Sequence, residues 1–163
     1  SMYQGALKGI KELGLDIKEE DIVATFHNVN GGIRADIKAG DITYGDIYNP
    51  FPFDNEIVLY KIRGAKFVQV KAKYSAYAVR RTFGNTRELD PNKDYYVIMT
   101  DFLALSDQYF GSPAVYGCTE ADLIRTGKVV RDEVASFVYE KDKIVGDDFS
   151  STKAPYKTIL QLD

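Results

Sequence analysis

Histidine, cysteine and tryptophan are almost missing from this chain of 163 residues, which has one His, one Cys and no Trp. A single Cys excludes an internal disulfide and any thiolate metal cage. Two-metal hydrolytic sites draw on several imidazoles and carboxylates, and His27 is the chain's one imidazole. We therefore predict that this chain itself holds no metal ion or other cofactor.

Long apolar runs and an excess of basic residues are also absent. No run approaches the ~18 apolar residues that span a membrane, and no amino-terminal signal pattern is present. The 21 Lys and Arg against 24 Asp and Glu give a formal net charge of −3. Such a chain lacks the broad basic face of a sequence-independent nucleic-acid binder. We predict no membrane span and no nucleic-acid partner.

The remaining composition is that of a globular protein, with 45% hydrophobic and 28% charged residues. The length predicts a single domain over residues 1–163, of which Ser1 and Met2 are expected to be vector-derived. A core of ordinary size is expected, because a chain of this length buries roughly 70% of its unfolded surface.

Hydrophobic spacing predicts strands and helices that alternate irregularly along the chain. Strands are expected at 21–26, 56–62, 73–79, 94–100 and 156–162, and helices at 4–13, 43–49, 119–122 and 130–138. Gly14 is expected to end the first helix, and Thr43 is expected to cap the second, with Asp46 three residues on. Residues 65–70 fit a helical turn or a continuing strand, and 101–118 reads as a long ordered loop. Without a regular βαβ rhythm, the pattern favours an α+β fold with a mixed sheet flanked by helices.

The sharpest local feature is the glycine loop that follows the first strand. Asn30-Gly31-Gly32 precedes Arg34, so backbone and guanidinium donors can approach the same ligand. Such a pattern suits an anion or a hydroxylated ligand, and it equally fits a glycine turn beside a surface arginine.

Two aromatic side chains in separate loops form the second candidate feature. Phe53 lies in Phe51-Pro52-Phe53, and Phe102 begins the long loop. Two such rings can clamp a planar base by stacking, although each could instead belong to the core. Asp101 and Asp107 in the same loop are expected to be solvated carboxylates.

His27 and Cys118 are the remaining candidates for chemistry. His27 directly follows an apolar strand and is expected to be a structural histidine with satisfied hydrogen bonds. Cys118 is expected to be a packed residue and not a nucleophile, since no second His could pair with it.

Two longer runs resemble a known family. They are NGGIRADIKAGDITYGDIYNPFPFDNEIVLYKIRGAKF from Asn30 to Phe67 and DPNKDYYVIMTDFLA from Asp90 to Ala104. Both resemble the carboxyl-terminal domain of the 5′-nucleotidase family, which includes UDP-sugar hydrolases and 2′,3′-cyclic-nucleotide phosphodiesterases. The chain's N-G-G-I-R loop is similar to the family's N-G-G-x-I-R or N-x-G-G-I-R pattern. The other shared elements are a G-x-I-T-Y element, a P-F-x-N turn and a D-P-x-K-x-Y strand.

The resemblance implies a division of labour between two domains. In the family, a separate amino-terminal metallophosphoesterase domain carries a divalent metal pair and the catalytic His. The carboxyl-terminal domain binds the nucleoside and delivers the phosphate to the metals by domain rotation. By resemblance, this chain binds a nucleotide or nucleoside for such a partner domain or subunit, and alone it is catalytically inactive.

The resemblance also implies a set of substrate-binding residues. Phe53 and Phe102 would sandwich the base, Asn55 would touch its edge, and Arg34 would face the sugar and phosphate. The remaining members are Asn30 and Gly32 of the glycine loop and Asp107, which would accept from ribose. Asp107 lies one position early in a loop that lacks the family's G-G-D-G motif.

Two other functions remain open beside a nucleotide-hydrolase domain. One is a stand-alone nucleoside-binding module, and the other is a degenerate domain used for dimerisation or surface interaction. Family members are usually secreted, periplasmic or attached to the cell surface, so the resemblance implies an extracellular, periplasmic or cell-surface location.

Overall fold

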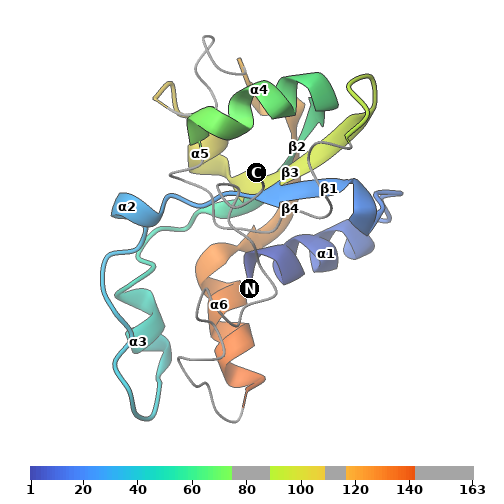
Figure 1. Ribbon diagram of the computed structural model, residues 1–163. Helices are drawn as coiled ribbons and strands as arrows, with labels where there is room; N and C mark the ends of the chain where they lie inside the picture. The colour runs from blue at the N-terminus through green and yellow to red at the C-terminus, as the bar shows by residue number, and fades with distance from the viewer. Residues whose placement is uncertain (75–88, 109–116, 142–163) are drawn as a thin grey trace.

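The computed structural model describes residues 1–74, 89–108 and 117–141 (Figure 1). The helices are α1 (Met2–Glu12), α2 (Val29–Gly32), α3 (Tyr44–Tyr48), α4 (Gly64–Tyr74), α5 (Asp101–Leu105) and α6 (Val130–Tyr139), with the 3-10 turns η1 (Glu19–Asp21) and η4 (Glu120–Asp122). The strands are β1 (Ile22–Thr25), β2 (Glu56–Arg63), β3 (Asp94–Thr100) and β4 (Leu123–Val129). No helix in these ranges is long and apolar enough to cross a membrane.

The four strands form one mixed sheet in the order β1-β3-β2-β4. β1 runs parallel to β3, and β2 is antiparallel to both β3 and β4. The predicted α+β fold with a mixed sheet flanked by helices is therefore confirmed.

Helices cover both faces of the sheet, as the alternation along β2 requires (Figure 1). Ile57 and Leu59 are fully buried against the layer that contains α1 and the start of α6. Val58 and Ile62 point to the opposite face, which α4 and α5 cover. The two core layers are therefore built from alternate residues of the same strand.

Several local predictions are confirmed by the structure. α1 ends as expected before Gly14, which has a φ of 64°. Thr43 and Asp46 form the expected capping box at the start of α3. Leu13, which helical spacing places on one face with Leu7 and Ile10, lies at the C-cap after α1 has ended at Glu12 and is 51% exposed.

Residues 64–74 form a helix where a strand prediction was partly wrong. The predicted strand 73–79 begins with Lys73 and Tyr74, which instead end α4, and the remaining residues lie outside the described ranges. The helix buries Phe67 completely against the sheet. Residues 65–70, which fitted either a helical turn or a continuing strand, are therefore helical, and the packing of the Phe67 ring stabilises that helix.

The carboxyl-terminal half holds two further corrections. The expected loop at 101–118 begins with the helix α5. β4 was missed because Gly127, with a φ of 68°, interrupts a run of polar residues. This glycine lies where the β2–β4 register shifts, as at a β-bulge, so the alternation that marks a strand is lost. The predicted strand at 156–162 lies outside the described residues.

Candidate functional site

One edge of the sheet collects the predicted site residues. Because β1 and β3 are parallel, the loops that follow them leave from the same edge. Antiparallel pairing brings the start of β2 to this edge, where Ile57 lies opposite Thr100. The end of β4 joins them, since Val129 pairs with Glu56. Thus the glycine loop, the turn before β2 and α5 become neighbours.

A shallow depression at this edge, too small to admit a water molecule, brings three of the predicted residues together. Gly32, Phe53 and Asn55 line it, and so do His27, Phe51 and Val130. The guanidinium carbon of Arg34 lies 5.2 Å from the centre of the Phe53 ring, a cation–π contact. The depression therefore offers an aromatic face and an amide side chain, and a charged donor lies over the Phe53 ring beside it.

The glycine loop needs both of its glycines. Gly31 has a φ of 94°, a conformation that residues with a side chain rarely adopt. A Cβ at Gly32 would lie 3.0 Å from Cε1 of His27 and 3.2 Å from Cβ of Asn28. The Arg34 amide then donates to the carbonyl of Pro50 at 2.9 Å, which ties this loop to the turn before β2.

The two predicted aromatic residues are both on the surface. The Phe53 side chain is 39% exposed and the Phe102 side chain is 47% exposed. Phe102 lies in the first turn of α5 at the same sheet edge, but it is not among the residues that line the depression. Asp107 is exposed in the turn after α5, and the side chain of Asn30 lies outside the described part of the structure. The base sandwich stays a prediction.

His27 is buried, as expected for a structural histidine, but its hydrogen bonds are not satisfied. The side chain is 5% exposed and meets Phe51 edge to face, with ring centres 6.2 Å apart. Within the described residues, Nδ1 has no hydrogen-bond partner of acceptable geometry. Burial lowers the pKa of His27, and the Asn28 backbone opposes that shift only in part.

His27 should make stability pH-dependent near neutrality. Because its pKa is lower in the folded chain, the unfolded chain binds a proton more readily below pH 6.5. The free energy of unfolding should then fall as pH drops from 7.5 to 5.5, by at most about 1.4 kcal/mol per pH unit. Urea unfolding at both pH values measures this, and His27→Gln should flatten the profile. An equally steep profile in the variant would contradict the assignment.

Arg131, at the start of α6, is a site-supporting residue that the sequence patterns do not reveal. Its guanidinium donates to the hydroxyl of Tyr44 at 2.9 Å, to the carbonyl of Phe51 at 3.4 Å and to the carboxylate of Asp54. It also stacks 4.7 Å from the Tyr48 ring centre. These contacts hold α3 and the turn that carries Phe53, although nothing local distinguishes this arginine from a solvated one.

Asp101 corrects another expectation. It was predicted to be a solvated carboxylate, but one of its oxygens accepts from the amides of Glu56, at 3.1 Å, and Phe102, at 2.8 Å. The same side chain therefore joins the start of β2 to the start of α5.

Part of this chain is similar in sequence to one family. The family model described as 5′-nucleotidase, C-terminal domain, matches residues 18–78. A stretch of 40 residues is 45% identical to a probable 5′-nucleotidase of Treponema pallidum (strain Nichols) and, over the same length, to an NAD 5′-nucleotidase of Haemophilus influenzae. Each match covers 24% of this chain and 7% of the relative.

Solved structures extend the likeness to most of the chain. The 5′-nucleotidase precursor of Thermus thermophilus superimposes with a TM-score of 0.57 at 20% identity, covering 89% of this chain and 33% of its own. The Haemophilus influenzae NAD nucleotidase gives a TM-score of 0.55 at 20% identity, covering 85% of this chain and 30% of its own. The chain thus spans about a third of these proteins and has the fold of one part of them.

Proposed function

Because the chain has the fold and, over residues 18–78, the sequence pattern of a 5′-nucleotidase carboxyl-terminal domain, we propose that it binds the substrate of a nucleotide hydrolase. The observation that carries this proposal is the depression lined by Gly32, Phe53 and Asn55, with Arg34 over the Phe53 ring. A stacking face beside a fixed fork of donors suits a base joined to a sugar and a phosphate.

The proposal gives each side chain a separate part of the nucleotide. Phe53 takes one face of the base and Phe102 the other, while Asn55 contacts the base edge. Arg34 donates to the sugar or phosphate, and Asp107 accepts from ribose. Asn30, in the glycine loop, contacts the base or the sugar.

Hydrolysis itself is assigned to a separate metallophosphoesterase domain or subunit. A divalent metal pair on that partner would supply the nucleophile and neutralise the phosphate, work that one histidine cannot do here. The chain would act outside the cytoplasm, in the periplasm, at the cell surface or in secreted form. The Thermus thermophilus relative, described as a precursor, supports this location.

Titration of the isotope-labelled full chain with adenosine and AMP tests the proposal. Two stacking faces contribute ~1–3 kcal/mol each, and hydrogen bonds to Arg34 contribute ~1.5–3 kcal/mol. Association costs at least ~4 kcal/mol, so the dissociation constant should be in the millimolar range. Amide shifts should concentrate at Gly32, Phe53 and Phe102, with ribose and inorganic phosphate as controls for partial ligands.

The same samples test the assignment of hydrolysis to a partner. With added Mn²⁺ or Mg²⁺, the chain should release no inorganic phosphate from AMP.

Each proposal has an outcome that would contradict it. Absence of any amide shift on titration with adenosine or AMP would overturn the binding proposal. Phosphate release that His27→Ala abolishes would instead show that the chain carries its own catalytic centre.

A further inference from the structure

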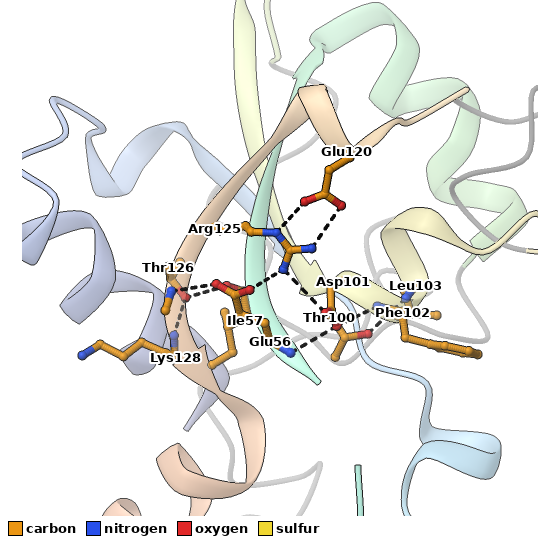
Figure 2. Close-up of polar contacts among 11 residues, drawn as sticks. Glu56, Ile57, Thr100, Asp101, Phe102, Leu103, Glu120, Arg125, Thr126 and Lys128 are labelled. Atoms are coloured by element: carbon orange, nitrogen blue, oxygen red, sulfur yellow. Dashed lines mark hydrogen bonds and ion pairs between the residues drawn. The ribbon is translucent and has the colours of Figure 1, made fainter. Parts of the chain in front are cut away.

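Arg125 of β4 links three carboxylates that come from different segments (Figure 2). Its guanidinium donates to Glu120, with the Nη2–Oε2 distance at 3.0 Å, and to the carboxylate of Glu56 at the start of β2. It also lies 3.7 Å from Oδ2 of Asp101. Hydrogen bonding to Arg125 lowers the pKa of Glu120, so this carboxylate stays ionised and faces a permanent cation.

Asp101 passes this restraint to the helix that carries Phe102. Its Oδ2 faces Arg125, while its Oδ1 accepts the amides of Glu56 and Phe102. One oxygen of this carboxylate thus pairs with Arg125, and the other accepts two backbone amides. Figure 2 shows the Phe102 ring pointing away from this network.

α5 depends on such contacts because it is too short to be stable alone. It has five residues, and isolated helices of that length do not form in water. Leu103 and Ala104 are buried and anchor its inner side, while Thr100 caps it by accepting the Leu103 amide at 3.2 Å. The outer side, where Phe102 lies, has no comparable burial, since that side chain is 47% exposed.

From this arrangement we infer that Arg125 is a positioning residue that, through Asp101, holds Phe102 in place for ligand stacking. The inference rests on the proposed nucleoside-binding function and adds a residue to it that lies outside the matched segment 18–78. Arg125 is 41% exposed at its side chain, and surface ion pairs contribute little to overall stability. Its effect is therefore local and should appear at α5 before it appears in global unfolding.

Hydrogen exchange of individual amides measures this local effect without any ligand. In Arg125→Gln, the amides of Glu56 and Phe102 should exchange about tenfold faster than in the parent, which corresponds to about 1.4 kcal/mol. The matched control is Lys128→Gln. Lys128 lies on β4, as Arg125 does, but its side chain pairs with Glu12 of α1 at 2.6 Å, away from α5. That variant should leave both amides unchanged. Both variants should melt within about 4 °C of the parent.

Adenosine titration of the same variants tests whether the position of Phe102 affects adenosine affinity. Arg125→Gln should weaken binding about threefold through lost preorganisation, and Lys128→Gln should bind like the parent. Asp101→Asn, which keeps an acceptor for the two amides, should retain more affinity than Asp101→Ala. If Arg125→Gln does not fold, these Asp101 variants still test whether Asp101 holds Phe102 in place.

The outcomes separate this inference from the function on which it rests. Unchanged exchange at Phe102 in Arg125→Gln overturns the inference, and so does faster exchange with unchanged adenosine affinity. Failure of the proposed function appears earlier, in the parent chain, as the absence of any adenosine-dependent shift.

Discussion

Gly64→Ala should lower the free energy of unfolding by about 3 kcal/mol, because the added methyl group has no room. A Cβ at this position would lie 2.2 Å from the carbonyl oxygen of Asp90 and 3.1 Å from Cε2 of Tyr95. The neighbouring backbone cannot easily give way, since the Gly64 amide donates to the carbonyl of Lys93 at 2.9 Å. Urea unfolding followed by circular dichroism measures the loss.

Gly45→Ala provides the matched control for that experiment. Gly45 lies in α3 without a positive φ, and the nearest atom to an added Cβ is Oγ1 of Thr43 at 3.6 Å. The substitution should leave stability unchanged or raise it by up to about 1 kcal/mol through helix propensity. A Gly64→Ala chain within about 1 kcal/mol of the parent would show that the crossing of α4 and the 90–93 turn can relax.

Phe102→Ala should remove most of the affinity for adenosine, the largest effect expected for a single side chain at the candidate site. Loss of one stacking face costs ~1–3 kcal/mol, which takes a millimolar dissociation constant beyond the range of a practical titration. The fold should survive, because about half of this side chain is exposed. Chemical-shift titration with adenosine measures the change.

Tyr139→Ala controls for the general loss of an aromatic residue. This side chain is 91% exposed at the end of α6, away from the lining of the depression. The variant should bind adenosine like the parent. If Phe102→Ala also binds like the parent, the base sandwich is wrong and an interaction role for the domain gains support.

Local sequence patterns determined much of the secondary structure. The β-branched and apolar runs of β1, β2 and β3 predicted three strands, and each is present in the sheet. Thr43 and Asp46 predicted the start of α3 because a capping box satisfies the first amides of a helix with side chains close in sequence. The shortage of histidine likewise led to the prediction that metal chemistry belongs to another domain.

The tertiary structure decided which of these elements meet. Because β1 pairs with β3 in parallel, Phe102 lies at the same edge of the sheet as Gly32 and Phe53. No local sequence pattern predicts that pairing. β4 stayed hidden because the glycine and bulge at 127 break the alternation that marks a strand.

The supporting contacts of the site also belong to the tertiary structure. Arg125 and Arg131 are ordinary charged residues in the sequence, and only the register between β2 and β4 places them against Glu56 and Asp54. Residue type and spacing are local properties, whereas strand register is set by packing across the whole sheet. The sequence by itself therefore indicated most of the helices and strands and proposed the site residues, and the sheet determined which side chains lie close together.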